Sequence, residues 1–256
     1  SKVAKAVLDS LRTNPPDGAD SIRDREVRAY IKDKIQRSPI ADAYNILILH
    51  DEGMMMRSDA DHIYSAAASF QNKRPLLLVL YSTGGVIGSA YLIGKLCRQY
   101  SNGRFIVVVP RQAKSAATLL CCAADEIHMG SLSELGPIDP QIDDFPALGL
   151  KTSVEHIADL VKGRPHAADM FAQYLHLSLK PIHLGYYERV AESAVQYAER
   201  LLKLHSENVS GKPEEIARDL VYSYKDHGFV IDKGEAATIF GNQVVKTDTE
   251  EYKLGN

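Results

Sequence analysis

Cysteine is scarce in this chain of 256 residues, and its scarcity argues against two classes of protein. The three cysteines are Cys97, Cys121 and Cys122, and two of them are adjacent. Such a set is too small for a disulfide framework, and it lacks the Cys-x-x-Cys spacing that is typical of zinc sites. We therefore expect reduced, buried thiols and no metal site.

The sequence also lacks long apolar runs and a large excess of charges of one sign. No apolar stretch reaches about 18 residues, the length that a transmembrane helix needs. The first residues lack the apolar core of a signal peptide. The net charge is −3 and the basic residues are scattered, so the positive surface of a nucleic-acid-binding protein is not expected. Together these absences predict a cytoplasmic protein without a membrane segment.

The hydrophobic content and the order of the sequence patterns indicate one large α/β domain. Hydrophobic residues make up 45% of the chain, enough to bury a sizeable core. From Asn45 onward, short apolar runs alternate with helical patterns, which predicts parallel strands joined by crossover helices. The expected strands are Ile46–Leu49, Leu76–Tyr81, Phe105–Val109 and Glu126–Met129.

Three regions follow from this pattern. Residues 1–40 predict a helical N-terminal appendage, interrupted at Asn14–Gly18. Residues 41–246 would form the α/β domain. A capping box at Thr152–Glu155 predicts a helix start, and a long amphipathic helix is expected from Tyr186 to His205. Residues 247–256 are polar and predict a loose tail.

The turn Ser82–Gly85 follows a strand and precedes a helix. Paired glycines leave backbone N–H groups uncovered, and a helix N-terminus adds further donors, so the turn suits an anion. A dinucleotide site is disfavoured, because Gly84, Gly85 and Gly88 do not give the G-x-G-x-x-G spacing. An oxyanion is the alternative anion.

A second turn, Gln112–Thr118, also joins a strand to a helix. Small residues surround Ser115 and leave its hydroxyl uncrowded. A serine at a helix start is commonly an N-cap. A serine next to a glycine turn is also the arrangement that acyl transfer needs, with a nucleophile facing oxyanion donors. The sequence leaves both interpretations open.

Four motifs occur in order over the core: Ser82–Gly85, Ala113–Leu119, Ala124–Gly130 and Leu135–Gln141. They resemble the serine dehydrogenase proteinase family, which belongs with signal peptide peptidase A and the Clp protease subunit in the crotonase-like superfamily. The resemblance implies a Clp/crotonase-like spiral of ββα units, with a mostly parallel sheet and a helical C-terminal part. It also implies a homo-oligomer.

The same resemblance assigns roles at the two turns. Ser115 matches the nucleophile, and Gly84 and Gly85 match the oxyanion-hole turn, with the N–H of Ala116 as the second donor. Two positions depart from the family pattern. Thr83 stands where relatives usually have proline, and Ala116 where they often have glycine.

The general base has two candidates. One is His227, oriented by Asp139, which would exchange the positions of the acid and the imidazole relative to the Clp subunit. The other is a lysine, as in signal peptide peptidase A, for which Lys151 is the first candidate, ahead of Lys162 and Lys180. Lys114 is adjacent to Ser115 but is expected to point elsewhere.

The sequence therefore predicts a serine endopeptidase that hydrolyses protein or peptide substrates without a cofactor. Two alternatives keep the same fold. One is a catalytically inactive scaffold subunit, and the other is a crotonase-like acyl-CoA enzyme.

Overall fold

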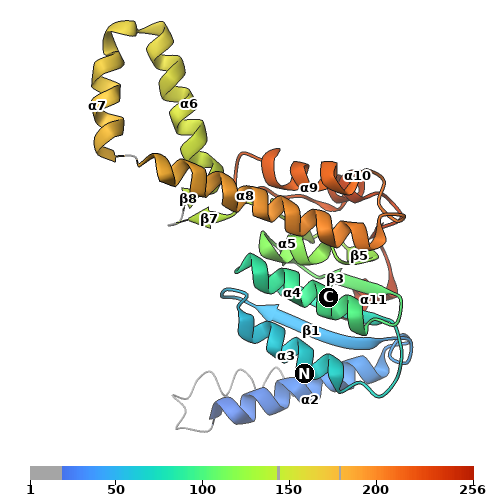
Figure 1. The fold of residues 1–256 in the computed structure, drawn as a ribbon. Coiled ribbons are helices and arrows are strands. Elements are labelled where there is room, and N and C mark those ends of the chain that lie inside the picture. Colours follow the sequence, from blue (N-terminus) through green and yellow to red (C-terminus); the bar gives the residue numbers. More distant parts are fainter. Residues whose placement is uncertain (1–18, 143–144, 179) are drawn as a thin grey trace. The chain divides into compact units, whose positions relative to one another are not determined.

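The computed structural model describes residues 19–142, 145–178 and 180–256, and divides the chain into two units, 1–44 and 45–256 (Figure 1). In the first unit, α2 (Ala19–Arg37) is the charged helix expected in the appendage. The earlier amphipathic segment expected over residues 3–11 lies outside the described residues.

The second unit is built on a parallel sheet. Its long strands are β1 (Asn45–Asp51), β2 (Leu76–Ser82), β3 (Phe105–Val109) and β5 (Glu126–Met129), and β9 (Val245–Lys246) follows β5. Two short strands, β4 (Gln112–Ala113) and β6 (Glu134–Leu135), extend the sheet from the end of β2. Every pairing in this sheet is parallel. The four strands predicted from apolar runs are confirmed.

Helices cover one face of the sheet with a continuous apolar core. These helices are α3 (Arg57–Ala68), α4 (Ile87–Tyr100) and α5 (Ala116–Cys121), and the core that they share with the strands contains Leu78, Val107 and Ile93. The register pairs Leu78 with Val107, so alternate residues of neighbouring strands face the same layer. Burial on both faces explains why β3 is apolar throughout.

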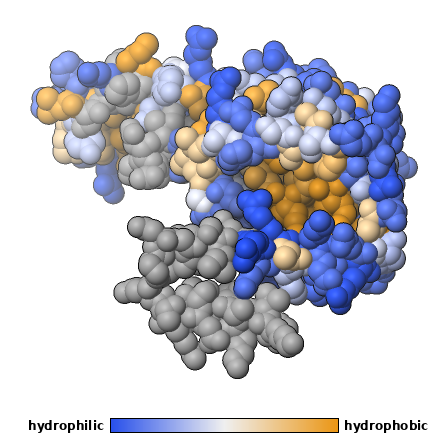
Figure 2. Space-filling model, turned by 90° about the horizontal axis from the view of Figure 1, so that it is seen from below, coloured by the Kyte–Doolittle hydropathy of each residue, from blue (hydrophilic) through white to orange (hydrophobic). Residues whose placement is uncertain are grey.

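The opposite face of the sheet is only partly covered. The helix α11 (Glu250–Gly255) lies over β3, where Gly255 approaches Val108 and Val79. At the edge strand β1, Ile48 is 42% exposed while its neighbours Leu47 and Leu49 are buried. Figure 2 shows that hydrophobic residues gather in one area of the face seen there and that hydrophilic residues surround them.

The C-terminal half is helical, as expected. A small hairpin of β7 (Gln141–Ile142) and β8 (Phe145–Pro146) leads into these helices. In order they are α6 (Ala147–Gly163), η1 (Pro165–Ala167), α7 (Ala168–Ser178), α8 (Pro181–Leu202), η2 (Lys203–His205), α9 (Pro213–Tyr222) and α10 (Lys233–Phe240).

Two expectations for this half are wrong. The capping box at Thr152 does not start a helix, because α6 already begins at Ala147. Residues 247–256 are not a loose tail either. Tyr252 of α11 packs on Gly130, where an added Cβ would lie 2.0 Å from the tyrosine ring, and Thr249 caps the helix. Only a glycine at 130 leaves room for this ring, a constraint that the polar sequence of the tail does not reveal.

The helices α6 and α7 carry exposed apolar residues. Among the described side chains of this pair, Met170, Tyr174 and Leu177 are 61%, 63% and 85% exposed. They recur three and four residues apart, on one face of α7. The homo-oligomer implied by the resemblance stays a prediction.

The three cysteines are expected to resist alkylation. Cys97, Cys121 and Cys122 are all 0% exposed, and burial raises the pKa of each thiol. Since the thiolate is the reacting form, iodoacetamide at mildly alkaline pH should leave the native protein unmodified. Mass spectrometry should show three adducts after denaturation in guanidinium chloride. Rapid alkylation of the native protein would contradict the buried positions.

Candidate active site

The carboxyl ends of two strands bring the predicted turns together. Ser82, the last residue of β2, pairs with Ala113, the last residue of β4. The two chains therefore turn away from the sheet side by side. A Cβ placed on Gly84 would lie 3.0 Å from Cβ of Ser115 and 3.4 Å from the nitrogen of Ala116. The turn that contains Ser115, here called the serine corner, and the turn that contains Gly84 and Gly85, the glycine corner, are thus in contact.

Ser115 has a backbone conformation that few non-glycine residues adopt. Its φ is 50° and its ψ is −114°, at the position directly before α5. Such strain persists only where surrounding contacts enforce it, and it concentrates at functional sites. The side chain makes no N-cap hydrogen bond, so the capping interpretation of Ser115 does not hold. The half-buried hydroxyl is therefore available for other chemistry.

Each corner contains a backbone amide without a protein acceptor among the described residues. Within the part of the chain that the structure describes, the N–H groups of Gly85 and Ala116 donate to no protein atom. Gly84 and Gly85 have φ of 116° and 146°, and a Cβ on Gly85 would lie 2.3 Å from the nitrogen of Met55. Glycine is thus required at both positions, and the two free amides can receive an anion.

Asp139 and His227 form a second cluster. Nδ1 of His227 lies 3.5 Å from Oδ2 of Asp139, and Nε2 of Gln141 lies 3.0 Å from that oxygen and 3.1 Å from the imidazole nitrogen. The hydrogen bond with Asp139 raises the pKa of His227 above its ordinary value of 6.5, and burial opposes this effect. Asp139 is 8% exposed, so its carboxylate acts on the imidazole with little screening.

An antiparallel pairing explains why these distant residues meet. Leu135 and Ile231 exchange both backbone hydrogen bonds, at 2.9 and 3.0 Å. Asp139 follows Leu135 by about four residues, and His227 precedes Ile231 by the same number. Because the two segments are antiparallel, these positions lie on the same side of the pair. Nζ of Lys114 donates to the carbonyls of Leu135 and Phe229, so these segments pass beside the serine corner.

The proposed nucleophile and the proposed base are not in contact. The hydroxyl of Ser115 has no hydrogen-bond partner among the described residues, and no bond to His227 is present there. Catalytic hydrogen bonds are often long before substrate binds and shorten in the complex with substrate.

The candidate lysines lie in exposed positions. Lys151 is on α6 with 51% of its side chain exposed, and it pairs with Glu188 of α8 at 3.2 Å. Lys162 pairs with Asp159, and Lys180 is an exposed residue that precedes α8. Lys114 points away from the hydroxyl of Ser115, as expected, because it pairs with Glu134. A lysine base requires a desolvated ammonium, which the exposed positions of Lys151, Lys162 and Lys180 do not supply, whereas the largely buried ammonium of Lys114 is paired with Glu134.

Sequence reasoning missed the residues that support the two corners. Oγ1 of Thr118 lies 2.7 Å from the carbonyl of Ala113 and 2.8 Å from that of Gly136, and it accepts the N–H of Gly136 at 3.2 Å. Gln141 bridges Asp139 and His227. Thr118 and Gln141 both lie within the sequence motifs, which could have marked them as important. A motif does not show which partner a side chain contacts.

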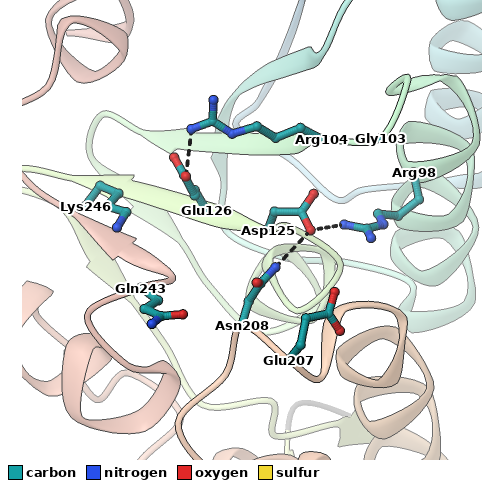
Figure 3. A pocket seen from close by; sticks show the side chains of 9 residues that line it. All are labelled: Arg98, Gly103, Arg104, Asp125, Glu126, Glu207, Asn208, Gln243 and Lys246. Atoms are coloured by element: carbon teal, nitrogen blue, oxygen red, sulfur yellow. Dashed lines mark hydrogen bonds and ion pairs between the residues drawn. The ribbon is translucent and has the colours of Figure 1, made fainter.

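Two pockets lie away from Ser115. One, of about 460 Å³, lies at the amino ends of β3 and β5, where Asp125 binds Arg98 and Asn208 (Figure 3). Arg104 and Glu126 pair beside it. The other, of about 590 Å³, is lined by Lys151 and by residues of α8 and α9. Their charges largely satisfy one another, so neither pocket competes with the serine corner as the candidate site.

Two further observations concern the described residues alone. None of their helices combines the length and apolarity needed to cross a lipid bilayer. Among the same residues, no three histidine, cysteine or acidic side chains cluster as metal ligands would.

The fold is a mostly parallel α/β sheet with two strand-to-helix corners in contact, and part of the sequence matches a known family. Residues 43–164 match the family of ClpP-like SDH-type serine proteinases. This confirms the resemblance inferred from the motifs. The matched segment contains both corners and includes Asp139 and Lys151, whereas His227 lies outside it.

Two relatives match part of this sequence. Two uncharacterized proteins of Methanocaldococcus jannaschii are 33% identical over 97 residues and 29% identical over 92 residues, which is 38% and 36% of this chain. The matches span only about a third of those relatives, 34% and 31% of their length. Their names assign no activity.

Solved structures extend the likeness over most of the chain. A serine-to-alanine variant of 1510-N, a membrane-bound stomatin-specific protease, has a TM-score of 0.50 at 15% identity and covers 81% of both chains. A lysine-to-alanine variant of it, in complex with a substrate peptide, has a TM-score of 0.50 at 14% identity and covers 81% of this chain and 76% of that chain. The α/β fold class is confirmed, and the family match supports a peptidase.

Replacing Thr118 by valine should lower the stability of the site. Valine keeps the shape but leaves the buried N–H of Gly136 without its acceptor, which costs about 2 kcal/mol. Urea unfolding should show this loss. Thr238→Val is the control, because the hydroxyl of that exposed threonine donates to the carbonyl of Gly234 in its own helix. Equal stability of the two variants would contradict the role of Thr118.

Proposed function

We propose that the protein is a serine peptidase in which Ser115 is the nucleophile and the N–H groups of Gly85 and Ala116 form the oxyanion hole. The observation that carries this proposal is the contact between the two corners. A strained serine, free of capping, lies against a glycine turn with uncovered amides. This is the arrangement that acyl transfer requires.

In the proposed reaction, Oγ of Ser115 attacks the carbonyl carbon of the scissile peptide bond and transfers its proton to the base. The two amides stabilise the negative charge on the carbonyl oxygen. The C–N bond then breaks, the base returns the proton to the amine, and an acyl-enzyme remains. Water attacks this ester with the same base, and the carboxylic acid and Ser115 are released.

His227 is the base that the contacts favour. Its Nδ1 faces Oδ2 of Asp139, and in the tautomer whose Nδ1–H donates to this carboxylate, Nε2 carries the lone pair that Ser115 needs, while the amide of Gln141 donates to Asp139. The hydrogen bond to Asp139 fixes the ring and favours the imidazolium that forms during attack. Lys151 is the rival, because the family match includes it. Its exposed pair with Glu188 opposes that role in this conformation.

The substrate class proposed is a protein or peptide segment. The support is the family match and the likeness to a protease whose variant was solved with a substrate peptide. No cofactor is needed for the reaction, because the serine, the base and the two amides supply all of its proton transfers and charge stabilisation.

A fluorophosphonate probe tests the proposed nucleophile. Mass spectrometry should locate one adduct on Ser115 of the wild type and none in Ser115→Ala, while Ser131→Ala is the matched control that still reacts. His227→Ala should slow labelling by about 100-fold or more, because the base is removed. Lys151→Ala should react at the wild-type rate.

The opposite result for the two base variants would establish the lysine dyad instead. A wild-type protein that is never labelled would reject the peptidase and favour the scaffold subunit.

The pH dependence tests the pairing of the base with the acid. The base must be neutral, so the labelling rate should rise as pH increases through the pKa of His227, with a midpoint above 6.5. Asp139→Asn removes the charge that favours imidazolium, so the midpoint should move to lower pH and the plateau rate should fall. An unchanged midpoint in Asp139→Asn would contradict the pair.

A further inference from the structure

Ser82 occupies a position that touches both corners of the candidate site. It is the last residue of β2, it is 0% exposed, and it pairs with Asp51 of β1 on one side and with Ala113 of β4 on the other. A buried serine in an otherwise apolar strand has to satisfy its hydroxyl inside the protein.

The polar atoms of Ser82 are divided between the two corners. Its carbonyl oxygen accepts the N–H of Lys114 at 3.0 Å, directly before the nucleophile. Its hydroxyl oxygen accepts the N–H of Gly84 at 3.0 Å, directly before the oxyanion donor of Gly85. One residue thus holds the backbone on each side of the space where the substrate carbonyl would lie.

Asp51 supports the hydroxyl from the neighbouring strand. Oδ2 of Asp51 lies 3.3 Å from Oγ of Ser82, and Oδ1 accepts the N–H of Gly53 at 2.8 Å. The single hydroxyl hydrogen of Ser82 therefore has two acceptors, this carboxylate and the carbonyl of Gly84, also at 3.3 Å.

The loop after β1 is tied to the same turn. Oγ1 of Thr83 donates to the carbonyl of Gly53 at 3.0 Å, and the N–H of Met55 donates to the carbonyl of Gly84 at 2.8 Å. The glycine turn is thus held between this loop and the serine corner.

We infer that Ser82 and Asp51 are positioning residues, which hold the Gly84–Gly85 turn so that the N–H of Gly85 points at the developing oxyanion. This inference rests on the proposed function of Ser115. Neither side chain needs to touch the substrate. Glycines offer no side chain that fixes their own conformation, so the orientation of the donor depends on neighbours. An oxyanion donor acts only when it is placed accurately before the reaction.

The first arm of the test measures the turn itself, without activity. Hydrogen exchange followed by mass spectrometry should show faster exchange at the amide of Gly84 in Ser82→Ala than in the wild type. Ser133→Ala is the matched control, since Ser133 is a buried serine that accepts the N–H of Gly130 at 2.7 Å and donates to the carbonyl of Val109 at 2.6 Å. It should accelerate exchange at Gly130 and leave Gly84 unchanged.

The second arm measures fluorophosphonate labelling of Ser115 over a range of probe concentrations. Ser82→Ala should lower the limiting labelling rate by about 10- to 100-fold, with the half-saturating concentration unchanged, because only the transition state loses a donor. Ser133→Ala should label like the wild type.

Asp51 variants separate positioning from charge. Asp51→Asn should retain most of the rate, since an amide can still donate to Oγ of Ser82 and accept from Gly53. Asp51→Ala should lose rate as Ser82→Ala does.

Each outcome has a distinct meaning. Unchanged exchange at Gly84 in Ser82→Ala overturns the inference, whatever the labelling shows. Faster exchange with a limiting rate equal to that of Ser133→Ala shows a structural role alone and also overturns it. A wild type that exchanges as described but is never labelled rejects the proposed function, and with it the catalytic part of the inference, while the hold of Ser82 on the turn stands.

Discussion

The site depends on the parallel pairing of Ser82 with Ala113 at the carboxyl end of β2. β3 already pairs with the earlier part of β2, up to Val79. After β3 the chain turns and enters β4 beside the last residue of β2. This shift along one strand places the corner that follows β4 directly against the corner that follows β2. Without this pairing, the two turns would leave the sheet apart from each other, and Ser115 would not lie against the glycine turn.

The contact between the corners has a conformational cost that the surroundings offset. Ser115 has a φ of 50°. Because Gly84 has no side chain, the turn that holds Ser115 can come close to it, and Gly85 makes room in the same way for the backbone of Met55. Buried hydroxyls hold both sides in place. Thr118 binds the carbonyl of Ala113 and the backbone of Gly136, while Ser82 binds the backbone on either side. Polar groups within an apolar core, one in α5 and one in β2, thus fix the geometry of the turns.

A different feature of the fold brings the acid and the imidazole together. An antiparallel bridge at Leu135 and Ile231 aligns two segments that are almost a hundred residues apart in the sequence. Asp139 and His227 meet at the end of this alignment, and Gln141 joins them. In the proposed triad the chain order of serine, acid and imidazole differs from that of the Clp subunit, but this order has no chemical consequence, because only the geometry acts.

Much of this protein could be predicted from local patterns in the sequence. The apolar runs identified β1, β2, β3 and β5, because residues buried on both faces of a parallel sheet must be hydrophobic. The glycine pair and the uncrowded Ser115 were visible for a similar reason, since special backbone conformations restrict residue type. Tertiary structure decided what no local pattern contains. It placed Gly84 against Ser115, Ser82 between two strands, and Tyr252 on Gly130, because these contacts depend on strand register and on the packing of segments distant in the chain.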